Sequence, residues 1–184
     1  MTTVVEPEGV VKAFSCYKRF HNDTHERQHM KFGTSALDFS ILPYQDGVNP
    51  PVTKPNPAFL KEIGEEGMRA LLDRFYMGLF ESPIKSLFPH SKEAMQKAGQ
   101  TSADFFIQIC GGTAYFNQNR GAPQMRGRHA PFAITPHARL HWLVTFEEAL
   151  QPIVEQKLSS EANIQSFWNY INVFSLWMIN TPEH

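Results

Sequence analysis

Apolar residues recur at the spacing of an α-helix in four separate stretches of this 184-residue chain, and this pattern limits the fold more than any other feature. The spacing predicts helices over residues 65–80 and 98–109, from Thr135-Pro136 onward, and from about Ser159 to Thr181-Pro182. Thr135 is suited to cap its helix, and proline is favoured at the first helical position. Because no strand-like alternation of useful length occurs, we expect an all-α domain.

Helix-breaking residues separate these stretches. Ser82-Pro83 ends the first predicted helix, because proline removes a backbone donor and disfavours helix before it. Gly111-Gly112 ends the second, because glycine accepts the left-handed conformation common at helix ends. Pro152 should kink the third helix or end its first part.

Residues 1–58 show no sustained period, and the part from Pro43 to Pro57 is too rich in proline for a helix. We interpret this region as an extended arm that packs on the following domain through Phe39, Ile41, Leu42 and Tyr44. Its own core would be too small to fold alone. The predicted division is therefore an N-terminal arm, 1–58, and one helical domain, 59–184.

The composition argues against several classes of function. A net charge of −1 and a pI near 6.7 give no basic surface for nucleic acid. No apolar run approaches the roughly 20 residues that span a bilayer, so we expect no membrane segment. The two cysteines, Cys16 and Cys110, form no CxxC pair and suit a reducing compartment, which favours a cytoplasmic location.

A histidine stands inside the most heavily punctuated stretch of the chain, residues 121–132, which contains Gly121, Pro123, Gly127 and Pro131. Such a stretch predicts a shaped loop rather than a helix interior. His129 in this loop could face an acidic or metal-bearing ligand. It could equally be an exposed or hydrogen-bonded loop histidine, and this stretch alone leaves both open.

Two further patterns could each reflect either a binding site or ordinary structure. His21, His25 and His29, with Cys16 before them, would share one face of a helix and could bind zinc or copper, or could belong to a solvated polar segment. The domain also carries many aromatic residues, which either fill its core or line an apolar pocket for a flat ligand. They are Phe75, Tyr76, Phe88, Phe105, Phe106, Phe132, Trp142, Phe146, Phe167, Trp168 and Phe174.

Three motifs occur in a fixed order: Asp73-Arg74-Phe75-Tyr76, then Gly111-Gly112, then Arg126-Gly127-Arg128-His129-Ala130-Pro131-Phe132, with Trp142 beyond them. Together they resemble the bacterial group II truncated haemoglobins over roughly residues 59–184. The resemblance implies a two-over-two globin-like helical sandwich that binds haem b, preceded here by an N-terminal extension.

The resemblance also implies roles for individual residues. His129 matches the proximal histidine that binds the iron, and Tyr76 and Trp142 match the side chains that face a gas bound on the other side. Ser102 stands where leucine or glutamine is common in the family, which implies a wider or wetter pocket. The remaining haem contacts that the resemblance implies are Phe88, Ala98, Phe105, Arg126, Arg128 and Phe132, with Arg126 or Arg128 partnering a propionate.

The function implied by the resemblance is binding of O2, NO and CO at a pentacoordinate iron. Because two donors near the gas would slow its release, chemistry between NO and O2 suits the chain better than bulk transport. Such chemistry needs an unidentified reductase, and the protein would be a monomer or homodimer. The alternatives are a peroxidase-like haem enzyme, and a haem-based sensor or interaction module that uses residues 1–58.

Overall fold

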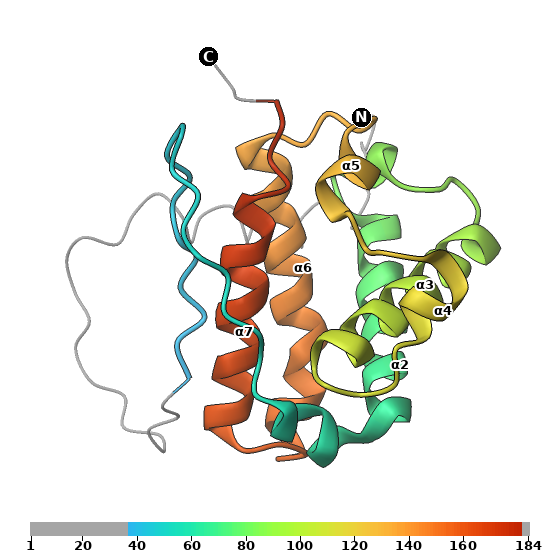
Figure 1. The fold of residues 1–184 in the computed structure, drawn as a ribbon, viewed down its shortest axis with the longest axis vertical. Coiled ribbons are helices and arrows are strands. Elements are labelled where there is room, and N and C mark those ends of the chain that lie inside the picture. The colour runs from blue at the N-terminus through green and yellow to red at the C-terminus, as the bar shows by residue number, and fades with distance from the viewer. Residues whose placement is uncertain (1–36, 182–184) are drawn as a thin grey trace, which may run out of the picture. The chain divides into compact units, whose positions relative to one another are not determined.

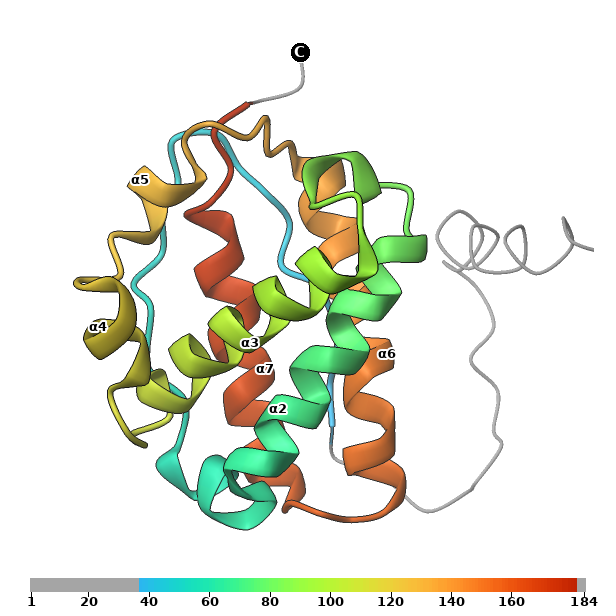
Figure 2. The ribbon, with the colours of Figure 1, turned by 90° about the vertical axis from the view of Figure 1, so that its right-hand side faces the viewer.

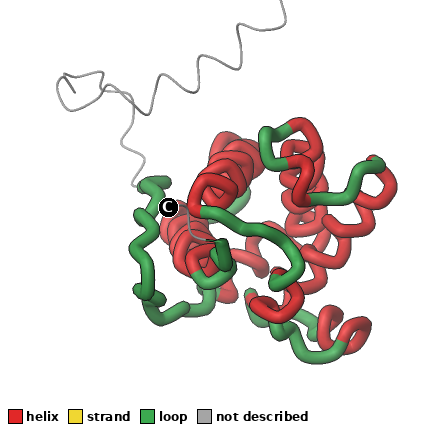
Figure 3. The backbone as a smooth tube through the Cα atoms, turned by 90° about the horizontal axis from the view of Figure 1, so that it is seen from above, coloured by secondary structure: helices red, strands yellow, loops and turns green. Residues whose placement is uncertain are grey.

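The computed structural model describes residues 37–181, which form helices and loops without a strand in that range. The helices are α2 (Pro57–Glu81), α3 (Lys92–Ile109), α4 (Tyr115–Arg120), α5 (Met125–His129), α6 (Pro136–Glu155) and α7 (Glu161–Leu176), with a 3-10 turn η2 (Lys85–Leu87). Figures 1 and 3 show their course. The predicted all-α class is confirmed.

The long helices form two pairs, α2 with α3 and α6 with α7, and the pairs pack on each other. Helix α2 packs against α3 and α6, and α6 packs against α7 (Figures 1 and 2). Between the pairs lies an aromatic core whose largest fully buried side chains include Trp168, Phe59, Phe75, Phe146 and Phe167. This arrangement is the two-over-two sandwich that the resemblance implies, and it places side chains of four long helices around one interior.

Helix α2 begins earlier than the sequence predicts. Asn56 caps it by accepting a hydrogen bond from the Ala58 amide at 3.0 Å, and Pro57 takes the first helical position. The helix is interrupted at Gly64, where φ is 72°, so the part after this kink matches the predicted helix over residues 65–80. Further along, Gly78 lets α6 approach closely, since a Cβ there would lie 2.7 Å from Thr145 Cγ2.

The predicted end of α3 at Gly111-Gly112 is confirmed. Gly111 has a φ of 84°, and the amides of Gly111 and Gly112 donate to the carbonyls of Gln108 and Ile107 at 3.1 and 2.9 Å. This pattern is a Schellman motif, which satisfies carbonyls that the helix leaves free. At the other end, Ser91 Oγ accepts a hydrogen bond from the Ala94 amide, so the helix begins at Lys92, before the predicted residue 98.

The predicted loop over residues 121–132 is only partly a loop. Two short helices occupy the region, α4 just before it and α5 within it, and neither is expected from the sequence. Gly121 and Gln124 have positive φ values of 72° and 41°, which turn the chain between them. Gly127 lies inside α5 and has no positive φ, so the predicted loop is wrong at this position.

The C-terminal helices follow the predicted starts more closely than the predicted ends. Thr135 caps α6 through its hydroxyl, which accepts from the Ala138 amide, and Ser160 precedes α7. Pro152 does not end α6, because the helix continues through it to Glu155. Helix α7 ends at Leu176, before the Thr181-Pro182 stop, and residues 177–181 run on as a tail.

Residues 37–56 are extended and lie along α7 (Figure 1). Phe39 and Ile41 pack on the core as predicted, but the Leu42 side chain is 43% exposed, which corrects the packing role expected for it. Only the backbone of Leu42 is bound: its amide donates to Asn172 Oδ1, and its carbonyl accepts from Arg139 Nη1. Whether the arm and the domain divide at residue 58 stays a prediction.

Arg139 of α6 is the buried cation that makes this attachment. Its Nη2 donates to the carbonyl and side-chain oxygens of Asn172, and its Nε donates to Ser175 Oγ at 2.9 Å. Burial lowers the pKa of Arg139 to about 10. The guanidinium is thus bound by backbone, amide and hydroxyl oxygens and joins α6, α7 and the extended segment.

Among residues 37–181, no helix is both long enough and apolar enough to cross a membrane.

Candidate functional site

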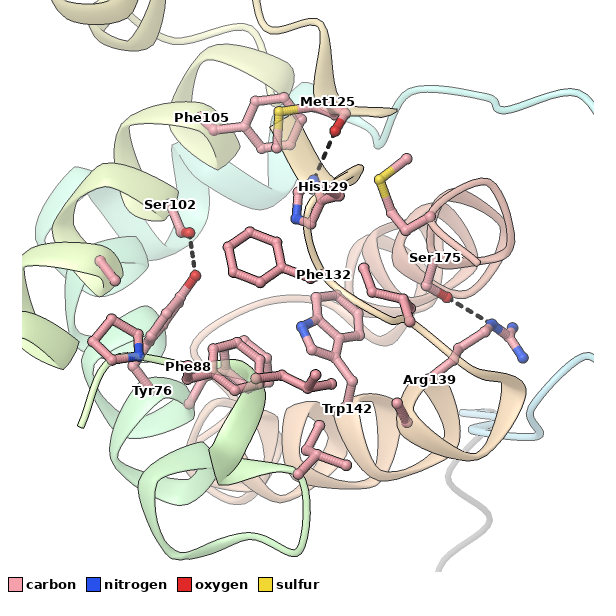
Figure 4. Close-up of a pocket in the computed structure, with 18 of the residues that line it drawn as sticks. Tyr76, Phe88, Ser102, Phe105, Met125, His129, Phe132, Arg139, Trp142 and Ser175 are labelled. Atoms are coloured by element: carbon pink, nitrogen blue, oxygen red, sulfur yellow. Dashed lines mark hydrogen bonds between the residues drawn. The ribbon is translucent and has the colours of Figure 1, made fainter. Parts of the chain in front are cut away.

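A cavity of about 630 Å³ opens into the interior between α2, α3, α5 and α6 (Figure 4). This volume is within the range of roughly 300–1,000 Å³ that is usual for small-molecule and cofactor sites. Its walls are mostly apolar and aromatic. Eight of the site residues that the family resemblance implies line it: Tyr76, Phe88, Ala98, Ser102, Phe105, His129, Phe132 and Trp142.

Tyr76 stands on α2 with its hydroxyl against α3. Its Oη lies 2.5 Å from Ser102 Oγ, and either oxygen can be the donor. Burial raises the pKa of Tyr76 above its ordinary value, although the hydrogen bond with Ser102 partly offsets this. The phenol therefore remains protonated at neutral pH, and it can donate a hydrogen bond into the cavity or to Ser102.

Ala98 and Ser102 lie one turn apart on α3, and both border the cavity. The Ser102 hydroxyl lies next to the phenol of Tyr76, and whether the pocket is wider or wetter than is common in the family stays a prediction. Sequence reasoning did not identify this contact, since the two residues are far apart in the chain and meet only where α2 crosses α3.

Trp142 projects from α6 and is held by two aromatic neighbours. Its ring lies 5.2 Å from that of Phe75, nearly perpendicular, and 5.1 Å from that of Phe146. Figure 4 shows the indole nitrogen turned toward the cavity. Among the described residues no group accepts a hydrogen bond from this N–H, which leaves it available to a ligand in the cavity.

His129 is the last residue of α5 and enters the cavity from the opposite chain segment. Its Nδ1 lies 2.7 Å from the carbonyl oxygen of Met125, one helical turn earlier. A carbonyl can only accept, so Nδ1 must carry the proton, and in the neutral ring the lone pair is on Nε2. A backbone carbonyl that fixes the tautomer in this way is typical of histidines that bind a metal.

The two arginines beside His129 do not line the large cavity. Arg128 donates from Nε to the carbonyl of Pro123 and from Nη2 to those of Arg120 and Ala122, and its guanidinium lies 5.3 Å from the Phe116 ring. Arg126 lies over the Trp177 ring instead. Arg128 does border a second cavity of about 460 Å³, which shares Ser102, Phe105, Met125 and His129 with the first.

Other residues of the site are absent from the sequence expectations. Met125 orients His129 through its backbone carbonyl. In the sequence, only the four-residue spacing between Met125 and His129 indicates this contact, and that spacing is informative only if the segment is helical. His90 and Met178 also line the cavity without belonging to any motif. Asn180 hydrogen-bonds to the carbonyls of His129 and Phe132, from beyond the end of α7.

No group of three or more histidine, cysteine, aspartate or glutamate side chains that could hold a metal ion occurs within residues 37–181. His129 is therefore not part of a protein metal cluster of that size within the described residues. The predicted zinc or copper site at His21, His25 and His29 lies outside the described residues.

A helical sandwich that places His129, Tyr76 and Trp142 around an apolar cavity is the architecture of a small globin. A family model for bacterial-like globins matches residues 59–180, and the chain belongs to that family. The resemblance to group II truncated haemoglobins is thereby confirmed, and membership implies a haem-binding protein of the class that binds diatomic gases.

Individual relatives agree with this assignment. The chain is 30% identical over 123 residues to the group 2 truncated hemoglobin YjbI of Bacillus subtilis, a match covering 66% of this chain and 87% of the relative. It is 28% identical over 116 residues to the two-on-two hemoglobin-3 of Arabidopsis thaliana, covering 61% of this chain and 65% of the plant protein. The chain thus spans slightly less than two thirds of that relative.

Solved structures show the same fold. The phosphate-bound Hell's gate globin IV superimposes with a TM-score of 0.65 at 34% identity, over 79% of this chain and 89% of that one. The truncated oxygen-avid haemoglobin from Bacillus subtilis superimposes with a TM-score of 0.60 at 27% identity, over 67% of this chain and 99% of that one.

Proposed function

We propose that the protein binds haem b in the 630 Å³ cavity, with His129 as the axial ligand, and that it binds O2, NO and CO for NO/O2 chemistry rather than bulk transport. The observation that carries this proposal is the hydrogen bond from His129 Nδ1 to the Met125 carbonyl. It leaves Nε2 as the one ring nitrogen with a lone pair, on a side chain that borders the cavity.

The cavity suits a flat apolar group that carries two carboxylates. Phe88, Phe105 and Phe132 provide aromatic surface around it, and Phe132 is 45% exposed, as a residue at the mouth would be. Arg128 and Arg126 are the cations nearest to His129 in sequence, and a guanidinium is suited to a carboxylate. We infer that Arg128, which borders the adjoining cavity, is the better placed of the two for a propionate.

The haem, when bound, supplies an iron that binds diatomic gases and exchanges electrons. The residues of this chain then determine how long a gas stays. The Tyr76 hydroxyl and the Trp142 N–H both face the cavity and can donate to a ligand that carries partial negative charge. Each such hydrogen bond contributes about 1.5–3 kcal/mol.

Slow release of O2 favours a reaction in the pocket over delivery of the gas. Conversion of NO and O2 to nitrate consumes one electron per turnover, so a separate reductase must return that electron. Ser102 contributes by holding the Tyr76 hydroxyl at a fixed position on the α3 side of the cavity. Pre-positioned donors of this kind act without reorganising when the ligand arrives.

The first test is an absorption spectrum of the purified protein, as isolated and after dithionite, and then with CO. We expect an intense Soret band that shifts on reduction and shifts again with CO. Absence of a Soret band even after addition of hemin would refute the proposal. If haem is present, stopped-flow mixing of the oxygenated protein with NO should give rapid loss of its spectrum and stoichiometric nitrate.

A further inference from the structure

The helix that carries His129 is too short to hold itself in place. Helix α5 has only five residues, no side chain caps its N-terminus, and none of its residues is buried. A single helical turn is not stable alone, because nucleation fixes several dihedral angles for one hydrogen bond. The position of the His129 ring therefore depends on contacts made from outside the helix.

One side chain from the C-terminal tail makes several of these contacts. Asn180 Nδ2 donates to the carbonyl of His129 at 3.2 Å and to that of Phe132 at 2.8 Å. Its Oδ1 accepts from the amide of Ile134 at 3.0 Å and from the hydroxyl of Thr181. The amide side chain thus bridges the end of α5 and the start of the connection to α6.

The backbone of the tail adds to this attachment. The amides of Asn180 and Thr181 both donate to the Ile134 carbonyl at 3.1 Å, so the tail and the segment after His129 run together. The tail is itself anchored, because Trp177 Nε1 donates to the Pro50 carbonyl at 2.8 Å. Arg126 of α5 lies over the same Trp177 ring.

We propose that Asn180 is a positioning residue for His129, which fixes the ring through the His129 carbonyl rather than by touching the haem. This inference rests on the proposed function, because it assigns a role toward the haem that His129 would bind. It extends that function to the tail after α7, and through Trp177 to a segment that precedes the matched globin region.

Substitutions can test the acceptor role of the Asn180 side-chain oxygen separately from the donor role of its nitrogen. Asn180→Asp keeps an acceptor for the Ile134 amide but replaces the donor to His129 and Phe132 with a carboxylate oxygen, which repels both carbonyls. Asn180→Ala removes the donor and the acceptor. Asn169→Asp is the matched control, because Asn169 is an exposed asparagine of α7 that hydrogen-bonds only to Gln165 within the described residues.

The experiment uses the full-length haem-loaded protein and three readouts. Resonance Raman spectra of the reduced protein report the iron–histidine stretching band, transfer of haem to an excess of a haem-free acceptor globin reports its retention, and urea unfolding reports overall stability. We expect both Asn180 variants to shift or broaden the band and to lose haem about five- to tenfold faster, on the scale of one or two hydrogen bonds. The control should match the wild type.

An unchanged band with unchanged haem loss in Asn180→Asp would overturn the inference. Faster haem loss that comes with a lower urea midpoint and an unchanged band would also overturn it, since the residue would then be only structural. These results are distinct from failure of the proposed function itself. A wild-type protein that holds haem without an iron–histidine band, or holds none, refutes His129 as the ligand and this inference with it.

Discussion

The two walls of the cavity are built in different ways. Tyr76, Ser102 and Trp142 stand on helices of 25, 18 and 20 residues whose other faces form the core. His129 stands on a five-residue helix without a buried residue, held by hydrogen bonds from Arg128 and Asn180 to backbone carbonyls. The first wall, formed by Tyr76, Ser102 and Trp142, is held by apolar packing. The second wall, formed by His129, is held by polar contacts between loops.

Because the two walls are held differently, the stability of the domain and the position of the iron ligand depend on different contacts. Removing a side chain behind the first wall opens a hole in the core, and the whole domain loses stability. Removing a polar contact behind α5 changes hydrogen bonds that water can partly replace, so the domain stays folded while His129 loses its fixed position. Variants on each side should therefore affect different measurements.

The largest expected effect on stability is behind the first wall. Phe75 is 1% exposed and packs on the rings of Trp142 and Phe146, so Phe75→Ala should lower the free energy of unfolding by about 3–5 kcal/mol. Urea unfolding checks this value. Arg128→Ala, on the second wall, should cost much less. Equal losses for the two variants would remove the distinction between the walls.

The largest expected effect on haem retention is at the second wall. His129→Ala should accelerate haem loss by more than about 100-fold, because the axial ligand is removed while the domain, whose core excludes α5, remains folded. His137→Ala is the control, since His137 is an exposed histidine of α6 that borders neither cavity. A reduced, CO-bound spectrum unchanged in His129→Ala would contradict the assigned ligand.

A graded pair of variants tests the hydrogen bonds of the first wall. Tyr76→Phe should release O2 roughly ten- to a hundredfold faster, since a donor to a charged acceptor is lost. Ser102→Ala should change the rate only a few-fold, because it removes the partner of the Tyr76 hydroxyl and not the donor. Stopped-flow displacement of O2 by CO measures both rates. Should Tyr76→Phe release O2 no faster than the wild type, Tyr76 is not the donor.

The smallest expected effect comes from the buried thiol of Cys110, which lines neither cavity. Burial raises the pKa of Cys110 to about 12, and the group is 1% exposed. Because this pKa is raised on folding, the protonated thiol's contribution to stability is complete below the unfolded pKa near 8.5 and declines as pH rises toward 12. The urea midpoint between pH 8 and 10.5 should fall more steeply for the wild type than for Cys110→Ala, and parallel slopes would contradict this.

The sequence by itself determined that the four long helices exist, together with the start of α6 and the end of α3, whereas α2 and α3 begin earlier than it predicts. Local rules are sufficient there, because an apolar stripe, Thr135-Pro136 and Gly111-Gly112 act within a few residues of where they stand. The motif around His129 likewise pointed to the globin family before any fold was known. The sequence did not predict helices α4 and α5, since such short helices have too few residues to show a period.

Only the tertiary structure decided which side chains meet. The contact of Tyr76 with Ser102 depends on where α2 crosses α3. In the described part of the chain, the Trp142 N–H is free because of the side chains that surround it in the fold. The attachment of His129 depends on Asn180, near the other end of the domain. None of these pairs is close in sequence, so no local pattern encodes them. They follow from burying the apolar faces of four helices together, which brings distant polar groups to one cavity.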